Sequence, residues 1–306
     1  MQESVGGIAS FRLRLPEKNS YILYIYAKED TPENKDNVYA QVCEYKIVQE
    51  ECCSPPPEPF PPCAYLNWGP GTSFFKYRLA TYQQTAQVIT REGKAELQIK
   101  IPKSMQFMAK LKSEHHSDSE LGGLCHDEDC SQEMRVTANL IEVEKEKDYP
   151  EFVFTQTQGS VVSFMVSMPN VGFYKLQLYA IPSNDTSQQL PGVYNYLVNC
   201  KSSQGTCVPY PKQYAQWKEG CYMWSPLCIH KSLGQPKVNF KVSIPKAEAV
   251  AVVTDSEWTH LQSVQPGIWT GEVEVGKYFD RGCKVTLNAN YGGDRTNYAT
   301  LLEYNI

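Results

Sequence analysis

The feature that most constrains the fold of this chain is an internal repeat. The segments SFRLRLP at 10–16 and YILYIYA at 21–27 recur half the chain later as SFMVSMP at 163–169 and YKLQLYA at 174–180. A related strand-and-proline signal occurs twice more, as LQIKIP at 97–102 and FKVSIP at 240–245. Because such self-similarity marks tandem copies of one structural unit, the sequence predicts four modules. Their expected bounds are 1–58 for an N-terminally incomplete first module, then 59–148, 149–206 and 207–306.

Each repeated segment alternates apolar and polar residues, which is the pattern of a half-buried strand. In the first copy we expect Phe11, Leu13 and Leu15 to face a core and the two intervening arginines to face water. Pro16 then ends the strand, because proline has no amide hydrogen for the sheet ladder. No segment shows a sustained 3.6-residue apolar period, so helices should be few and short. Several short strands separated by turn signals predict β-sandwiches.

Composition and charge favour the same class and exclude several kinds of partner. The chain has 306 residues and 20 tyrosines, and aromatic and branched side chains suit pleated sheets. A net charge of -5 with interspersed signs offers no basic stripe for nucleic acid. No run of residues approaches the length of about 18 apolar positions that a membrane helix needs, and Met1–Ser10 lacks the regions of a signal peptide. We therefore expect a cytoplasmic protein that neither binds nucleic acid nor inserts into a membrane.

Three segments between the predicted strands are expected to lie outside the sheets. The proline-rich stretch at 52–62 should be an extended linker between the first two modules. The stretch at 115–132, rich in Ser, Asp, Glu and Gly, should be a solvated excursion of the second module. Residues 254–267 occupy the corresponding place in the fourth module.

The cysteines are compatible with a reducing cytoplasm or with an oxidising extracellular space. There are 11 of them, so at least one cannot be paired within the chain. Cys43, Cys200 and Cys283 lie in or beside apolar strand patterns, where a free thiol packs as a small apolar group. The alternative is an extracellular adhesion or coat protein linked by disulfides, which the single glycosylation sequon at Asn184 also permits.

The residues that could carry chemistry do not form a recognised site. A zinc site can be written from His115, His116, Cys125, His126 and Cys130, but the cysteine spacing is too long and the residues suit a hydrated loop equally well. Cys221 and Cys228 lie near His230 in sequence, yet the segment YMWSP between them is typical of aromatic packing between strands. No phosphate-binding loop, nucleophile elbow or zinc-protease motif occurs. The sequence therefore predicts no catalytic, cofactor-binding or metal-binding residue.

The tryptophans and their flanking glycines fit a structural role better than a catalytic one. We expect most of Trp68, Trp217, Trp224, Trp258 and Trp269 to fill sandwich cores, because such rings bury a large area. Any exposed minority can serve as binding anchors. The flanking glycines, which we expect to set turns, are Gly69, Gly71, Gly267 and Gly271.

These segments together resemble a known family. The succession FRLRLP at 11–16, YILYIYA at 21–27, VCEYKI at 42–47, PFP at 59–61 and WGP at 68–70 is similar to the C-terminal region of kyphoscoliosis peptidase and its invertebrate relatives, the hillarins. The resemblance covers essentially the whole chain, is strongest in residues 10–70 and 160–200, and weakens in the second copy, where Trp217-Lys218-Glu219 replaces the WGP motif. Members of that family carry an upstream transglutaminase-like domain with a Cys-His-Asp triad, and no stretch here resembles it. The resemblance implies a cytoplasmic, cytoskeleton-associated protein whose β modules recruit other proteins.

The sequence thus predicts an all-β fold of tandem, internally duplicated immunoglobulin-like β-sandwich modules. The expected function is a non-catalytic protein-interaction array, a cytoskeleton-associated scaffold that binds other proteins and needs no cofactor. Two alternatives stay open at this point. One is a residual cysteine-dependent peptidase or transglutaminase-like activity, and the other is the extracellular, disulfide-linked protein. The sequence does not name the partner or the oligomeric state.

Overall fold

The computed structural model describes the greater part of the chain and divides it into two units. The described residues are 2–5, 8–15, 18–27, 39–51, 60, 68–102, 134–142, 147–182, 190–203, 207–293 and 296–306. One unit holds residues 10–62 together with Met1, and the other holds 2–9 and 63–306. The predicted linker at 52–62, apart from residue 60, and the predicted excursion at 115–132 lie outside the described residues.

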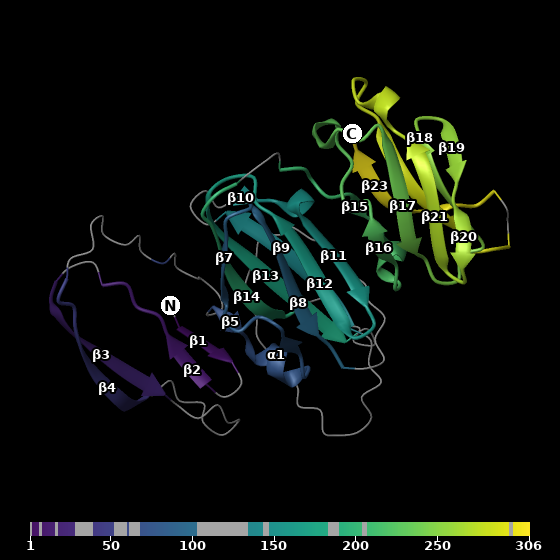
Figure 1. Ribbon diagram of the computed structural model, residues 1–306. Coiled ribbons are helices and arrows are strands. Elements are labelled where there is room, and N and C mark those ends of the chain that lie inside the picture. The colour runs from purple at the N-terminus through teal and green to yellow at the C-terminus, as the bar shows by residue number, and fades with distance from the viewer. Residues whose placement is uncertain are drawn as a thin grey trace, which may run out of the picture. The chain divides into compact units, whose positions relative to one another are not determined.

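The first unit contains an antiparallel hairpin of β3 (Ser20–Ala27) and β4 (Ala40–Val48) (Figure 1). Ahead of this hairpin, β1 (Gln2–Val5) pairs with β2 (Ile8–Phe11), and residues 2–9 belong to the second unit. The strand β2 ends earlier than the sequence predicts. Residues 12–15 form no strand, and Leu13 is 44% exposed. The expectation that Leu13 faces a core was therefore wrong, because among the described residues no sheet continues there to cover it.

The second unit begins with a sandwich of two sheets (Figure 1). Its elements are β5 (Gly69–Pro70), α1 (Thr72–Lys76), β6 (Ala80–Thr81), β7 (Gln87–Thr90), β8 (Lys94–Lys100), β9 (Met134–Glu142), β10 (Lys147–Asp148), η1 (Pro150–Phe152), β11 (Val153–Gln158), β12 (Val161–Ser167), β13 (Gly172–Pro182) and β14 (Gly192–Cys200). One sheet has the order β10-β9-β13-β14-β5, with β7 parallel to β14. The other has the order β11-β12-β8-β6.

Alternation of side chains builds the core of this first sandwich. In the strand β8, Leu97 and Ile99 are buried while the residues at both ends face water. The neighbouring strand β12 of the same sheet supplies Phe164, which pairs with Leu97 in the ladder and is completely buried. A hydrogen bond of 2.5 Å between the hydroxyls of Thr81 and Tyr196 links the two sheets. Burying such large side chains between two sheets is what stabilises a sandwich.

Strand pairing in this sandwich crosses one of the predicted module boundaries. The strand β8 belongs to the predicted module 59–148, whereas its neighbour β12 belongs to 149–206. Likewise β9 pairs with β13 along its whole length. Pairing alone does not establish which segments fold independently, so the division into four modules stays a prediction.

A second sandwich occupies the C-terminal part of the same unit (Figure 1). Its elements are β15 (Lys212–Gln213), η2 (Ala215–Lys218), β16 (Tyr222–Ser225), η3 (Lys231–Leu233), β17 (Lys237–Ser243), β18 (Ala249–Thr254), β19 (Glu257–His260), β20 (Gln262–Gln265), β21 (Ile268–Glu274), η4 (Gly276–Tyr278), β22 (Lys284–Asn290) and β23 (Ala299–Asn305). The sheets have the orders β15-β23-β22-β18-β19 and β16-β17-β21-β20. Phe240 of one sheet meets Tyr304 of the other edge to face, with ring centroids 6.1 Å apart.

Direct contacts join the two sandwiches. Phe154, on the outer side of the first, packs against Trp217 of the second with ring centroids 5.7 Å apart. Beside it, the Gln213 side chain binds the backbone of the edge strand β11: its Nε2 donates to the Thr155 carbonyl (2.6 Å) and its Oε1 accepts from the Thr155 N–H (3.3 Å). An edge strand offers unpaired backbone groups, and this amide satisfies two of them.

The segment 254–267 does not form the excursion that the sequence suggests. It carries the two strands β19 and β20. Asp255 adopts φ 54° in the tight turn between β18 and β19, a conformation that Asp tolerates better than most residues. Gly267 adopts φ 75° in the turn before β21. The prediction failed because polar residues on exposed edge strands cannot be told from loop residues by composition alone.

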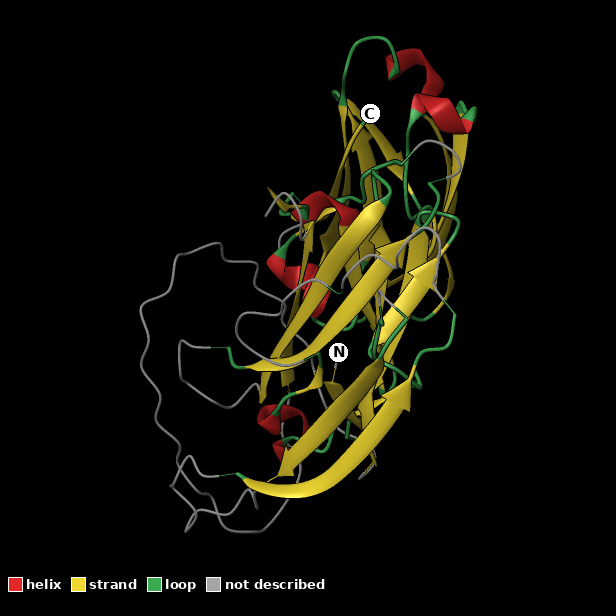
Figure 2. Cartoon of the chain, turned by 90° about the vertical axis from the view of Figure 1, so that its left-hand side faces the viewer, coloured by secondary structure: helices red, strands yellow, loops and turns green. Residues whose placement is uncertain are grey.

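Helices are few and short throughout the described residues, as the sequence predicts (Figure 2). In the described ranges the one α-helix spans five residues, and the 3-10 helices span three or four. None of the described helices is long and apolar enough to cross a membrane. The prediction of an all-β protein built from sandwiches is confirmed.

Candidate interaction surfaces

The thiol of Cys221 is a core group and is unsuited to nucleophilic attack. Cys221 follows η2, is 3% exposed, and its Sγ donates a hydrogen bond to the Gln216 carbonyl at 3.7 Å. Burial raises the pKa of Cys221 to about 12, with the nearby Glu219 carboxylate adding to the rise. Because the thiolate is the nucleophile, a thiol with such a pKa stays protonated and unreactive near neutral pH.

The other two residues of the candidate thiol site engage different partners. Cys228 Sγ donates to the Val208 carbonyl at 3.9 Å, and burial raises the pKa of Cys228 to about 11, although Lys94 lowers it. The His230 ring Nδ1 contacts Ser232, at 2.7 Å from Oγ and 3.1 Å from the backbone N–H. The described contacts therefore do not couple the histidine to a cysteine.

The candidate zinc ligands at 115, 116, 125, 126 and 130 lie outside the described residues. In the part of the chain that the structure describes, no group of three or more His, Cys, Asp or Glu side chains is placed to hold a metal ion. The six described cysteines, Cys43, Cys200, Cys207, Cys221, Cys228 and Cys283, are free thiols. Cys200 is fully buried as expected, but Cys43 and Cys283 are only half-buried.

The tryptophans divide into core and surface residues. Trp68, Trp217 and Trp269 are between 1% and 7% exposed and fill cores. Trp224 and Trp258 are 39% and 50% exposed. The two exposed rings are the kind of aromatic group that anchors protein interfaces.

Trp258 belongs to an aromatic cluster on one sheet of the second sandwich. Its ring meets Tyr298 edge to face with centroids 5.1 Å apart, and both rings lie 6.4 Å from the imidazole of His260. Trp258 and His260 come from the edge strand β19, whereas Tyr298 directly precedes β23. The cluster places a broad aromatic surface in contact with solvent.

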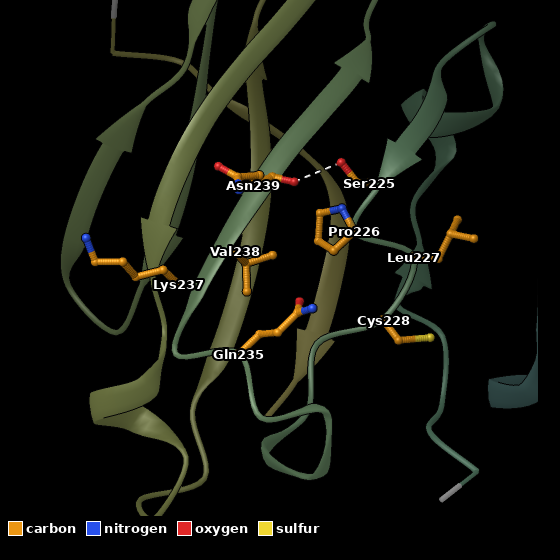
Figure 3. A pocket seen from close by; sticks show the side chains of 8 residues that line it. All are labelled: Ser225, Pro226, Leu227, Cys228, Gln235, Lys237, Val238 and Asn239. Atoms are coloured by element: carbon orange, nitrogen blue, oxygen red, sulfur yellow. Dashed lines mark hydrogen bonds between the residues drawn. The ribbon is translucent and has the colours of Figure 1, made fainter. Parts of the chain in front are cut away.

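An open groove lies at the edge of the other sheet, beside β17 (Figure 3). Its volume is about 490 Å³. Residues from two segments line it. They are Ser225 at the end of β16 with Pro226, Leu227 and Cys228 after it, and Gln235 ahead of β17 with Lys237, Val238 and Asn239 at its start. Figure 3 shows the Ser225 hydroxyl reaching across to β17, where it donates a hydrogen bond of 2.9 Å to the Asn239 carbonyl.

The groove exists because β16 pairs with the second half of β17 and leaves the first half of β17 without a neighbour on this side. The last ladder pair between them is Ser225 with Lys241, so the first residues of β17 have no pair from β16. Pro226 follows at once and has no N–H to continue the ladder. Since backbone groups alternate sides along a strand, the N–H and C=O of Lys237 and Asn239 point to this edge. An extended segment of another protein can pair with such an edge.

Comparison with known proteins places the chain in a family. A sequence model of the KY-like, immunoglobulin-like domain matches residues 1–61 and 71–211, well over half of the chain. The chain belongs to this family. The KY-like match confirms the resemblance seen in the sequence and the immunoglobulin-like character of the fold. The matched range ends before β15, so the second sandwich lies outside it.

Hillarin of Drosophila melanogaster is similar over part of the chain. The two proteins are 26% identical over 184 residues, which is 58% of this chain and 19% of Hillarin. Among solved structures, the I9–I11 tandem of titin is 8% identical with a TM-score of 0.19, covering 73% of this chain and 64% of that one. The periplasmic chaperone SfaE is 14% identical with a TM-score of 0.23, covering 72% and 98%. These TM-scores are too low to support any argument. The KY-like domain match and the likeness to Hillarin support a non-catalytic protein-interaction module.

Sequence reasoning did not find the groove or the Trp258 cluster. The available signal for the groove was Ser225-Pro226 directly after the alternating residues of β16, because a proline there must end the pairing. The signal for the cluster was the alternation Trp258, Thr259, His260, which lies inside 254–267, the counterpart of the predicted excursion at 115–132.

Proposed function

We propose that this chain is a protein-interaction array that associates with the cytoskeleton and binds an extended segment of a partner protein in the groove beside β17. The observation that carries the proposal is the unpaired start of β17. Lys237 and Asn239 direct their backbone N–H groups, and Lys237 also its carbonyl, into an open space, while the Asn239 carbonyl already accepts from Ser225 Oγ. An extended polypeptide backbone offers acceptors and a donor that match these groups. The family resemblance supports the cytoskeletal setting.

The absence of an activated thiol at the described candidates supports a binding role rather than a catalytic one. Cys221 and Cys228 have raised pKa values because they are buried, and a catalytic cysteine needs a lowered pKa or an adjacent base. The exposed Trp224 precedes the groove residue Ser225 and offers an aromatic surface to a partner. Lys241 of β17 lies over this ring, with its Nζ 5.3 Å from the ring centroid.

Retention of the purified chain by the detergent-insoluble cytoskeletal fraction of animal cells tests the proposal. We expect the wild type to be retained and Asn239→Pro to be released, because proline removes the N–H that faces the groove while leaving the pairing with β21 intact. Asn239→Ala is the matched control, because it keeps the backbone donor. Equal retention of all three proteins, or release of the wild type, would contradict the proposal.

A further inference from the structure

The hairpin β3–β4 of the first unit is built like the hairpin β13–β14 of the first sandwich. In β3–β4, Tyr21 pairs with Ile47, Leu23 with Tyr45 and Ile25 with Cys43. The corresponding pairs in the repeat are Tyr174 with Val198, Leu176 with Tyr196 and Leu178 with Tyr194. Both ladders also shift register at the same place, after Ile25 in one and after Leu178 in the other. The two hairpins are therefore equivalent strand for strand.

The two hairpins differ in what covers them. In the first sandwich, β9 pairs beside β13, while β5 and β7 pair beside β14. The six residues named above in β13 and β14 are all 0% exposed. In the described part of the first unit, β3 and β4 pair only with each other, and Tyr45 is 52% exposed. A two-stranded ribbon is only marginally stable in water, so this hairpin needs a partner.

The edge of β4 that no described strand covers has a defined set of backbone donors and acceptors. Gln49, just past the strand, donates its N–H to the Asn19 carbonyl at 2.9 Å. Because an antiparallel ladder alternates its bonds from residue to residue, the odd-numbered residues between Cys43 and Gln49, on this side of the register shift, bond toward β3. The backbone groups of Glu44 and Lys46 therefore point away from β3, toward the open edge.

The sequence of this edge is complementary to itself. An antiparallel pair of β4 strands related by a two-fold axis at Tyr45 places Glu44 of each copy opposite Lys46 of the other. The same axis places Cys43 opposite Ile47 and Val42 opposite Val48, so apolar residues also meet apolar residues. Opposite charges directly across a ladder stabilise the pair, and like charges destabilise it. A two-fold interface requires this kind of self-complementarity.

We propose that β4 binds β4 of a second copy of this chain, forming a continuous four-stranded antiparallel sheet in the order β3-β4-β4-β3. Glu44 of each copy exchanges backbone N–H···O bonds with Lys46 of the other, and the two side-chain pairs carry opposite charges. One face of this sheet collects Tyr21, Leu23, Ile25, Cys43, Tyr45 and Ile47 from both copies. The β4 strand of the second copy thus lies beside β4 as β5 and β7 lie beside β14.

Sedimentation of the full chain over a wide concentration range, with charge-reversal variants, tests the proposal. We expect a dimer whose dissociation constant rises about tenfold or more in Glu44→Lys and in Lys46→Glu, because each reversal creates two like-charged pairs per dimer. An equimolar mixture of these two variants should recover wild-type affinity, since every pair is then again of opposite charge. Glu50→Lys is the matched control, because the two-fold axis places it opposite the uncharged Ala40.

Cross-linking at the axis reports on the geometry even where a charge variant folds poorly. Residue 45 faces its own copy in a non-hydrogen-bonded pair, whose Cα atoms lie about 4.5 Å apart, within the range of a disulfide. The oxidant diamide should therefore take two protons and two electrons from the thiols of two Tyr45→Cys chains and link them, whereas Glu50→Cys and the wild type should link far less. A chain that stays monomeric at every concentration, a dimer unaffected by both reversals, or a mixture that fails to recover affinity would overturn the proposal. Its outcome is independent of the cytoskeletal proposal, which concerns β17.

Discussion

Single buried groups set how this protein responds to pH and to small changes in volume. The Cys221 thiol is the clearest case, because burial shifts its pKa from the usual value near 9 to about 12. The folded state then keeps this proton up to a higher pH than the unfolded state does. Between the two values the unfolded state binds fewer protons, so raising the pH in that window favours unfolding.

Replacement of Cys221 should therefore make the free energy of unfolding fall less steeply as the pH rises. The group contributes a slope of at most about 1.4 kcal/mol per pH unit, which Cys221→Ala removes. Thermal unfolding midpoints from pH 8 to pH 11 measure it, and the half-buried Cys283→Ala is the control. If the Cys221→Ala protein lost stability with pH as steeply as the wild type, the burial of this thiol would not govern the effect.

Two glycines of the second sandwich should differ in their tolerance of a methyl group. A Cβ on Gly276 would lie 2.9 Å from the Pro236 Cα and 2.5 Å from its Cβ, so the backbone itself must move. A Cβ on Gly271 would lie 2.7 Å from the Leu261 Cδ2, the end of a flexible side chain. We expect Gly276→Ala to destabilise by about 1–3 kcal/mol and Gly271→Ala by less. Chemical denaturation compares them, and a larger effect at Gly271 would contradict this reasoning.

At the level of elements, the edge of β11 depends on one side chain. Gln213 makes two hydrogen bonds to the Thr155 backbone, and losing them leaves partly buried groups without partners. We expect Gln213→Ala to cost about 1–2 kcal/mol, seen as a lower thermal midpoint. Gln265→Ala, on the exposed edge strand β20, is the control and should change little. Equal midpoints for both variants would show that the contact stabilises nothing.

The elements also show what the sequence could predict. Strands such as β8, β12 and β17 follow from alternation ended by proline, which is a local signal. The parallel pairing of β7 with β14 does not, because residues of similar pattern can pair with many partners. The groove beside β17 depends on where β16 leaves the sheet, and that is a property of the assembled sandwich. Local pattern therefore predicted strands well and their neighbours poorly.

On the scale of the whole molecule, strands from 59–148 and from 149–206 share both sheets of the first sandwich. We expect neither segment to fold alone, since each would expose a core that the other covers. A fragment of residues 59–211 should melt cooperatively, while 59–148 and 149–206 produced separately should show no cooperative transition by circular dichroism. A cooperative transition of either half would instead support the four-module division.

The short strand β15 has a mechanical consequence. It runs antiparallel to β23, and Lys212 lies opposite Glu303, so the chain enters and leaves the second sandwich at the same end of this ladder. Tension between these two points loads the hydrogen bonds one pair at a time, as in opening a zipper, instead of shearing them together. A pull applied between Lys212 and Glu303 should therefore separate β15 from β23 at a lower force than a pull that shears the two strands along their length.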